Sequence, residues 1–275
     1  MKVLTKNIIQ SILKPRKPFS HKGDFGHALL IAGNTSKMGA AVIAAKACMR
    51  AGVGRITVSV PQEETIILPI ALPEAMICIR EKDCDNFNLF NAAGIGCGIG
   101  VSKETLQMVT YLLEQFKKPI LLDADALNII AENKTLLNNI PIGTVITPHP
   151  MEFDRLFGAH SNIEERKLTA IEKAKKLNIV IVLKDHKTLI TYNGKSFENT
   201  TGNAGLAKAG SGDALSGVIT AFMAQGYHPF DAAKCGVYLH GLAADICLKK
   251  QSKESMLITD VIECFGIAFK KIFPN

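Results

Sequence analysis

Short runs of β-branched and aliphatic residues alternate along this chain with longer segments in which apolar residues recur at helical spacing. Most of the short runs are apolar on both faces, which is typical of buried strands in a parallel sheet. Glycine, proline or a capping residue marks the switches between the two patterns. Repeated β-α-β units bury such a sheet between two layers of helices. The sequence therefore predicts an α/β protein, a three-layer α/β/α sandwich with a mostly parallel central sheet.

Eight strands are expected, at residues 27–32, 55–60, 75–80, 92–95, 119–123, 144–147, 179–183 and 188–192. The last two precede Asn193-Gly194, and an antiparallel hairpin at the sheet edge is the alternative for them. Helices are expected at residues 39–51, 102–116 with Ser102 as N-cap, 161–177, 214–225, 229 to about 249, and 259 to about 273. For the helix at 161–177, Ser161 and Glu164 suggest a capping box. Its expected buried face consists of Leu168, Ile171, Ala174 and Leu177.

Length and composition favour a single domain over residues 1–275, because no low-complexity stretch divides the chain. No apolar stretch approaches the roughly 20 residues that span a bilayer. No signal peptide is recognisable, so we expect a cytoplasmic protein without a membrane partner. The seven cysteines contain no C-x-x-C pair, which favours reduced thiols over a zinc site. The net charge of +7 favours anionic partners, but no basic stretch interleaved with aromatics suggests nucleic acid.

The strongest functional signal is the run at residues 202–213, which ends in Gly210-Ser211-Gly212-Asp213 and opens a helix. Glycines let the backbone wrap an anion, and a helix N-terminus offers unpaired N–H groups with a partial positive charge. Asp213 is either the N-cap of this helix or a general base, and the glycines before it favour the base. The run is not a Walker A loop, because no G-K-[ST] follows the glycines. It predicts a phosphate-handling centre.

Other strand-to-helix junctions are polar or rich in glycine, and ligands bind at such junctions in α/β sheets. Residues 33–40 and 94–100 are candidate binding loops, with a plain flexible loop and a tight packing turn as their alternatives. Of Asp123 and Asp125, one is expected to cap a helix and the other to bind hydrated magnesium or a substrate hydroxyl. Prolines on both sides of His149 favour a ligand contact over a structural role.

The polar turn at residues 184–188 is either a solvated hairpin or a phosphate-binding segment, because a lysine supplies a point charge for phosphate.

Taken together, these segments resemble the NAD(P)H-hydrate dehydratases, repair enzymes with a ribokinase-like domain. The matching segments are residues 21–27, the alanine-rich helix after Gly39, and residues 96–100, 123–128, 147–153 and 202–213. The resemblance covers nearly the whole chain and implies a ribokinase-like fold. We expect no counterpart in this sequence of the epimerase domain that is often fused to this domain.

The resemblance implies an ATP- or ADP-dependent dehydration that restores NADH or NADPH from its hydrate, with ADP as the usual donor in bacterial members. It also implies Mg²⁺ and a homotetramer. Asp213, Gly210, Ser211 and Gly212 would carry catalysis. By position, the substrate contacts would be Ala40, Gly100, His149 and Asp213, and the nucleotide contacts Lys184, Asp185, His186, Lys187, Thr188, Asn203 and Gly212.

Four residues depart from the family pattern: Cys97, Met151, Ala204 and Lys208. Met151 adds bulk beside His149, and Lys208 either contacts phosphate or points to solvent. A ribokinase-fold kinase acting on hydroxymethylpyrimidine, hydroxyethylthiazole or pyridoxal is the nearest alternative function, because fold does not fix substrate. A nucleotide-sensing protein without turnover is the second alternative, and the presence of Asp213 argues against it.

Overall fold

The computed structural model describes residues 1–80 and 82–273. Ten strands form one sheet in the order β1-β10-β9-β8-β7-β6-β5-β2-β3-β4. Strands β8 to β4 in this order are all parallel, whereas β9 runs antiparallel to β8 and to β10. The strands are β1 Lys2–Val3, β2 His27–Ile31, β3 Arg55–Val60, β4 Met76–Ile79, β5 Ala92–Ile95, β6 Ile120–Leu122, β7 Val145–Ile146, β8 Val180–Leu183, β9 Leu189–Tyr192 and β10 Lys195–Glu198.

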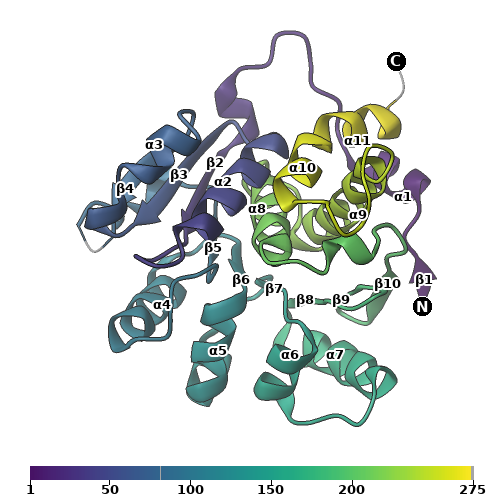
Figure 1. Cartoon of the computed structure of the whole chain (residues 1–275). Coiled ribbons are helices and arrows are strands. Elements are labelled where there is room, and N and C mark those ends of the chain that lie inside the picture. Colours follow the sequence, from purple (N-terminus) through teal and green to yellow (C-terminus); the bar gives the residue numbers. More distant parts are fainter. Residues whose placement is uncertain (81, 274–275) are drawn as a thin grey trace.

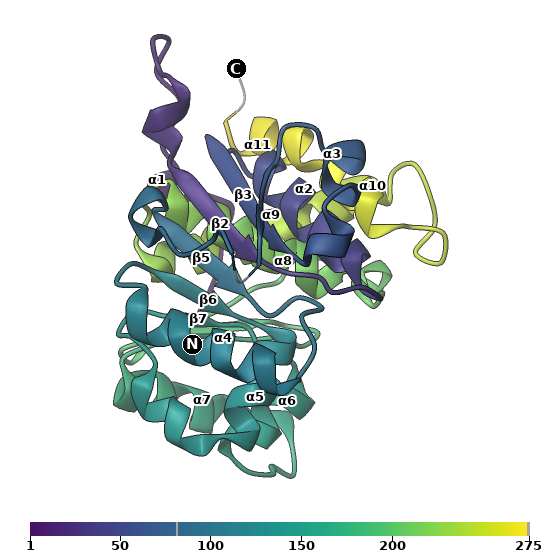
Figure 2. The same ribbon diagram turned by 90° about the vertical axis from the view of Figure 1, so that its left-hand side faces the viewer.

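Helices cover both faces of the sheet, as Figures 1 and 2 show from two directions. Residues Ala28 and Leu30 of β2 point into the apolar layer beneath α2, α8 and α9, whereas Leu29 and Ile31 point to the layer of α4 to α7. This alternation is the period of two that a strand buried on both faces requires. The helices are α1 Lys6–Ile12, α2 Met38–Arg50, α3 Ile67–Ala71, α4 Lys103–Gln115, α5 Ala124–Glu132, α6 Pro150–Phe157, α7 Ile163–Leu177, α8 Ser211–Ala224, α9 Pro229–Cys247, α10 Ile258–Glu263 and α11 Phe265–Ile272.

The predicted three-layer α/β/α sandwich is confirmed, and the eight expected strands are all present. The antiparallel pairing of β8 with β9 is confirmed too, but this hairpin is not the edge of the sheet. The short strands β10 and β1 lie outside it. Asn193 and Gly194 form the turn between β9 and β10, with φ of 45° and 76°. The sequence indicated the turn, but β1 and β10 are too short and polar to be recognised.

Three details of the predicted helices are wrong. The N-cap of α7 is Asn162, whose side chain accepts a hydrogen bond from the Glu165 N–H, so the capping residues lie one position later than Ser161 and Glu164. Leu168 is 69% exposed, because α7 turns Ala170 and Ala174 toward the sheet instead. The helix expected from 259 to about 273 is divided at Cys264 into α10 and α11.

Cysteine pairing also differs from expectation. Cys78 and Cys84 form a disulfide, with their Cα atoms 5.6 Å apart, so the prediction of reduced thiols is wrong for this pair. The other five cysteines are free and buried. Among residues 1–80 and 82–273, no helix combines the length and apolarity that crossing a bilayer requires.

The polypeptide reverses its direction of travel across the sheet between β2 and β5. From β2 the chain builds outward through β3 to β4, and it then returns to the other side of β2 as β5 and continues to β8. The loops after β2 and β5 therefore diverge, which leaves a crevice at the carboxyl ends of the strands where ligands bind in such sheets.

Close packing of α8 on α2 fixes the position of the helix that begins at the glycine run. A Cβ atom on Gly217 would lie 2.0 Å from the Ala44 carbonyl oxygen, so the two helix backbones are in direct contact there. Only a residue without a side chain fits this crossing.

We expect Gly217→Ala to lower the free energy of unfolding by about 1–3 kcal/mol, because the added methyl group must push α8 away from α2. Urea denaturation at neutral pH measures this change. Gly266→Ala is the matched control, because a Cβ there meets no atom within 4 Å, and it is expected to be neutral or slightly stabilising. Equal stability of both variants would contradict the close contact.

Candidate active site

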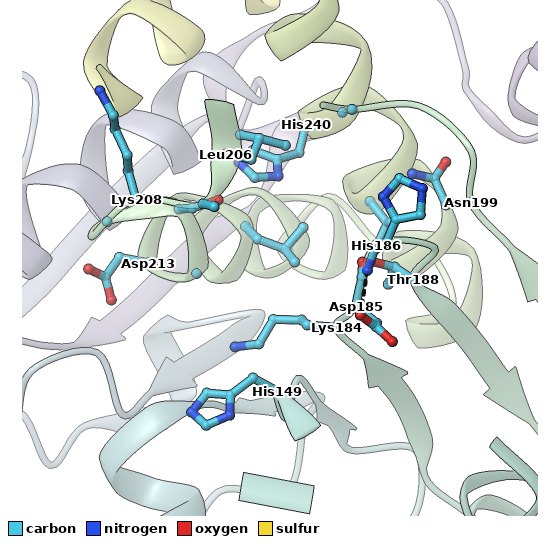
Figure 3. Close-up of a pocket in the computed structure, with 18 of the residues that line it drawn as sticks. His149, Lys184, Asp185, His186, Thr188, Asn199, Leu206, Lys208, Asp213 and His240 are labelled. Carbon is cyan, nitrogen blue, oxygen red and sulfur yellow. Dashed lines mark hydrogen bonds between the residues drawn. The ribbon is translucent and has the colours of Figure 1, made fainter. Parts of the chain in front are cut away.

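A cavity of about 760 Å³ lies where the N-terminus of α8 faces the loops that follow β6, β7 and β8. Figure 3 shows side chains from these separate segments pointing toward one space. Of the residues proposed from the sequence, those that line it are Asp123, His149, Lys184, Asp185, His186, Thr188, Asn203, Gly210, Ser211, Gly212 and Asp213. The cavity therefore gathers residues from distant parts of the sequence, from Asp123 to Gly241.

The first turn of α8 presents backbone donors to this cavity. Gly210 is the N-cap with a φ of 92°, a conformation that favours glycine, and no side chain caps the helix. The Ser211 N–H donates to the Lys208 carbonyl over 3.3 Å. Across the described chain, no acceptor is found for the N–H groups of Gly212 and Asp213. Two donors and the positive end of the helix dipole are thus available to an anion.

Asp213 is the third residue of α8, so it is not the N-cap, which was one of its two predicted roles. Burial raises the pKa of its carboxyl, and the nearby Asp123 carboxylate adds to the rise. An acid whose pKa is raised holds a proton more strongly and is a better base than an ordinary carboxylate. Its position beside the free N–H groups suits proton transfer next to a bound phosphate.

A buried ion pair forms the floor of the site. Lys184 Nζ lies 2.8 Å from Asp123 Oδ1 and 3.8 Å from Glu152 Oε2. The other oxygen of Asp123 accepts a hydrogen bond of 2.7 Å from the Ser216 hydroxyl of α8. Burial alone would lower the pKa of Lys184, but the two carboxylates raise it above its ordinary value. Lys184 therefore stays charged and ties the ends of β6 and β8 to α6.

Neither acid of the pair after β6 caps the helix that follows. Asp123 occupies the N-cap position of α5 but makes no capping hydrogen bond, because its oxygens hold Lys184 and Ser216. Asp125 Oδ2 accepts a hydrogen bond of 2.8 Å from the Gly100 N–H. The prediction that one of them acts as a helix cap is therefore wrong, because both carboxylates bond to residues distant in the sequence and not to the start of α5.

His149 has a structural role in addition to its place in the cavity. It is the N-cap of α6, and its Nδ1 accepts from the N–H groups of Met151 and Glu152. Burial lowers the pKa of the imidazole, although the Glu152 carboxylate opposes the shift. A neutral ring that accepts at Nδ1 carries its proton on Nε2, which lies 3.3 Å from Glu152 Oε1. Nε2 is therefore a hydrogen-bond donor at the edge of the cavity.

Four residues proposed from the sequence do not line this cavity, namely Ala40, Gly100, Asp125 and Lys187. Gly100 lines a second cavity of about 540 Å³ on the side of β3 and β4. A Cβ on Gly98 would lie 3.0 Å from the Ala40 Cβ, so the loop after β5 rests against the start of α2. Ala40 and Gly100 thus lie near each other at the crevice between β2 and β5, beside the main cavity.

Six further lining residues lie outside the segments that the sequence indicated: Asn199, Thr201, Leu215, Val237, His240 and Gly241. Most are apolar or lie within α9, where the spacing indicated an ordinary core helix. For His240 a signal was present, because a histidine inside an apolar helix is unusual.

The four residues that depart from the family pattern lie in different surroundings. Lys208 turns away from the cavity interior, and its Nζ donates to the Glu254 carbonyl over 2.5 Å (Figure 3). Met151 is 63% exposed beside His149. Cys97 is buried close to Asp213, and burial raises the pKa of its thiol well above the ordinary value. Ala204 begins the short 3₁₀ turn Ala204–Leu206.

The described part of the chain contains no group of three or more His, Cys, Asp or Glu side chains arranged to hold a metal ion. Asp123 and Glu152 are already engaged by Lys184. No salt bridge is found for Asp213 among the described residues, and its carboxylate faces the cavity. A metal ion at this site would therefore depend mainly on ligands from a bound molecule and from water.

Comparison with known families gives a match over residues 28–265 to the family model described as NAD(P)H-hydrate dehydratase. The chain belongs to the NAD(P)H-hydrate dehydratase family. The ADP-dependent (S)-NAD(P)H-hydrate dehydratase of Neisseria meningitidis is 37% identical over 243 residues, which cover 86% of this chain and 81% of the relative. The bifunctional NAD(P)H-hydrate repair enzyme Nnr of Moorella thermoacetica is 33% identical over 278 residues. That match covers 95% of this chain but 52% of the relative, so the chain spans about half the length of the bifunctional enzyme.

Solved structures of dehydratases in this family have the same fold. The ADP/ATP-dependent NAD(P)H-hydrate dehydratase of Bacillus subtilis, co-crystallized with ATP/Mg²⁺, matches with a TM-score of 0.86 and 30% identity over 98% of both chains. A ribokinase-like superfamily protein of Enterococcus faecalis matches with a TM-score of 0.85 and 28% identity, covering 98% of this chain and 96% of that one. A hydroxyethylthiazole kinase of Pyrococcus horikoshii, at 17% identity and a TM-score of 0.63 over 86% and 87% of the two chains, shares the fold alone. The ribokinase-like fold is thereby confirmed.

We expect Lys184→Met to destabilise the protein by about 3–5 kcal/mol, because it leaves two buried carboxylates without their cation. Urea denaturation at pH 7 measures the loss. The control is Lys187→Met, since Lys187 is exposed in the same turn and its replacement should change stability by less than about 0.5 kcal/mol. A Lys184→Met variant as stable as its control would show that the ion pair does not support the fold.

Proposed function

We propose that this protein is a nucleotide-dependent (S)-NAD(P)H-hydrate dehydratase with ADP as the expected phosphate donor, and that it restores NADH and NADPH from their hydrates. One observation carries the proposal. In a chain of this family, the free N–H groups of α8, the charged Lys184 and the Asp213 carboxyl converge on one cavity. That combination suits phosphoryl transfer from a nucleotide to a hydroxyl group held beside Asp213.

The chemistry follows from the poor leaving ability of hydroxide. The oxygen of the ring hydroxyl attacks the terminal phosphorus of the nucleotide while Asp213 takes the hydroxyl proton. The bond between that phosphorus and the bridging oxygen breaks, which leaves AMP when the donor is ADP. The lone pair of the ring nitrogen then expels the phosphate with the former hydroxyl oxygen. Loss of a proton from the adjacent ring carbon restores the dihydronicotinamide. The products are NADH or NADPH, AMP and phosphate.

Backbone and side-chain groups divide the binding between them in this proposal. The N–H groups of Gly212 and Asp213 hold the transferring phosphoryl group together with Gly210 and Ser211. Lys184 to Thr188 and Asn203 hold the rest of the nucleotide. Ala40, Gly100 and His149 contact the hydrate from the side of the crevice between β2 and β5.

Magnesium is proposed as the partner of the nucleotide phosphates, which would hold it together with water, since Asp213 is needed as the base. When bound, it would neutralise phosphate charge during transfer. We further propose that residues 1–275 act as one domain in the cytoplasm and assemble as a homotetramer, as the family resemblance implies. One continuous sheet that includes the N-terminal β1 supports the single domain.

The direct test mixes acid-hydrated NADH with the protein, magnesium and ADP or ATP, and follows recovery of the absorbance of the reduced nicotinamide. Wild type should recover NADH and release phosphate with at least one nucleotide. Asp213→Asn should lose turnover by about 10³-fold or more while its Kd for ADP changes little, because the lost group acts in the chemical step. Near-normal turnover of Asp213→Asn would exclude Asp213 as the base.

Although Asp213→Asn is expected to lose turnover, it is expected to gain stability. Because burial raises the pKa of the Asp213 carboxyl, the folded state binds its proton more tightly than the unfolded chain does. Ionisation of Asp213 at neutral pH therefore costs stability. Asp213→Asn should be more stable than wild type at pH 7, and the gap should close as the pH falls below the ordinary range of an aspartate. Urea denaturation at pH 7 and at about pH 3.5 would measure both values.

Two substitutions separate the structural and binding roles of His149. His149→Asn retains an oxygen that can cap α6, whereas His149→Ala removes the cap at a cost of about 1 kcal/mol. Both remove the Nε2 donor. We expect both variants to raise the KM for the hydrate several-fold and to leave the Kd for ADP unchanged. A normal KM in His149→Asn would assign His149 a capping role only.

A vitamin-precursor kinase of the same fold is the weaker alternative, since dehydratases match at 37% identity and the kinase at 17%. A kinase would accumulate a stable phosphorylated product, whereas the dehydratase releases phosphate in step with NADH recovery.

A further inference from the structure

The disulfide between Cys78 and Cys84 closes the loop that follows β4, the edge strand of the sheet (Figure 1). Cys78 lies in β4 and is 9% exposed. Cys84 is half-buried and lines a cavity of about 400 Å³ between this loop and α4. A small molecule that enters this cavity can therefore reach Cys84. No step of the proposed chemistry uses this pair of cysteines.

Apart from the disulfide, few contacts hold the residues between β4 and the 3₁₀ turn Phe87–Leu89. At the start of this segment the Arg80 N–H donates to a carbonyl of β3 over 2.8 Å. At its end the Phe87 ring packs on Phe116, with the ring centroids 5.5 Å apart. Residues 82, 83, 85 and 86 are exposed, and the backbone hydrogen bonds described for residues 82–86 are all local. The cross-link is therefore the main restraint on this segment.

The cross-linked loop forms part of the wall of a second cavity, the one of about 540 Å³ that contains Gly100. Four residues line both cavities, namely Arg80, Lys82, Glu104 and Met108. Of these, Arg80 and Lys82 lie inside the loop that the disulfide closes. The disulfide thus restrains a wall beside one of the proposed contacts of the hydrate.

The same loop supports the start of the segment that leads to Ala40, another proposed contact of the hydrate. Nη2 of Arg80 donates to three carbonyl groups over 2.9, 2.9 and 3.0 Å, those of Ala32, Gly33 and Ser59. These bonds connect the closed loop with the ends of β2 and β3. Since Gly33 begins the loop before α2, a shift of Arg80 is passed on toward Ala40.

We propose that the Cys78–Cys84 disulfide is a reversible redox switch that sets the affinity of the protein for the hydrate. This inference rests on the proposed function, which places the hydrate against Ala40 and Gly100. In the oxidised state the loop is held as a wall of the cavity. In the reduced state residues 82–86 gain conformational freedom that binding must remove again, so the affinity falls. Disulfides of proteins in a reducing compartment are commonly of this redox-sensing kind.

The switch operates by thiol–disulfide exchange with a low-molecular-weight thiol. The thiolate attacks the sulfur of Cys84, the S–S bond breaks, and the sulfur of Cys78 leaves as a thiolate that takes up a proton. A second thiol molecule attacks the small-molecule sulfur of the mixed disulfide and releases Cys84 as a thiol. Two thiols are thus oxidised to one small-molecule disulfide, and the protein disulfide gains two electrons and two protons. The small-molecule disulfide drives the reverse reaction.

The test equilibrates the full-length protein in mixtures of reduced and oxidised glutathione near neutral pH. Alkylation followed by peptide mass spectrometry measures the state of the pair, and parallel assays give kcat and KM for the hydrate and the Kd for NADPH and for ADP. We expect full reduction to raise the KM for the hydrate and the Kd for NADPH by roughly threefold to tenfold, which corresponds to ordering about one residue. Re-oxidation should restore both values.

The kcat and the Kd for ADP should stay within about twofold of their oxidised values, because residues 78–80 and 82–86 do not line the cavity that contains Asp213. General loss of structure would change all four quantities together, so this separation distinguishes the switch from a purely structural disulfide.

Two variants assign the effect to this pair. Cys84→Ser cannot form the disulfide and should show the raised KM in both reduced and oxidised glutathione. The matched control is Cys264→Ala, which keeps Cys78 and Cys84 and removes a free cysteine that lies near Cys247. It should respond to glutathione as wild type does, and loss of its response would assign the effect to the second pair. Circular dichroism reports whether each variant folds.

The inference is overturned if the pair stays reduced in oxidised glutathione or stays oxidised in reduced glutathione. Equal KM for the hydrate and equal Kd for NADPH in the two states would overturn it as well. If Cys84→Ser does not fold, the comparison of reduced with oxidised wild type decides. Normal turnover with the same KM in both states sinks this inference alone. A Kd for NADPH that follows the redox state without any turnover would sink the dehydratase activity and leave the switch standing.

Discussion

The buried pair of Lys184 and Asp123 is the interaction on which the site depends. It joins the ends of two strands that are separated in the sheet by β7, and through Ser216 and Glu152 it reaches α8 and α6. Removing two charges from water is costly, and mutual attraction offsets that cost only when further hydrogen bonds complete the geometry. Here Ser216 of α8 supplies a hydrogen bond and Glu152 of α6 a second carboxylate. The charge that a phosphate meets is therefore fixed in place by the same contacts that close the fold.

Asp213 and the first turn of α8 illustrate a conflict between stability and chemistry. The helix begins at a glycine with a positive φ and has no side-chain cap, which leaves its first N–H groups free. The carboxyl beside them is buried and lies near a second acid, so its ionised form is disfavoured. Each feature weakens the fold locally, and each favours an anionic ligand together with proton transfer. Close packing of α8 on α2 compensates for these local costs.

His149 and the acids after β6 mark the limit of local reasoning. The flanking prolines correctly placed His149 at the edge of the cavity, but the sequence did not reveal that its Nδ1 caps α6. An aspartate before a helix normally caps it, yet Asp123 instead holds a lysine 61 residues away. Likewise, α7 exposes Leu168 because the neighbouring strands accept smaller alanines there. In each case a long-range contact outweighed a local preference of similar strength.

The sequence by itself determined the layers, the parallel strands, the glycine run that opens α8 and the residues that resemble a dehydratase. These features depend on periodicity and on backbone freedom, which neighbouring residues encode. Only the tertiary structure decided that His240 and the apolar side chains around it share a cavity with Asp213, and that Ala40 and Gly100 lie beside that cavity. Such neighbours come from separate strands and helices, and their meeting depends on strand order and helix packing. Hydrophobic spacing carries no information about that order.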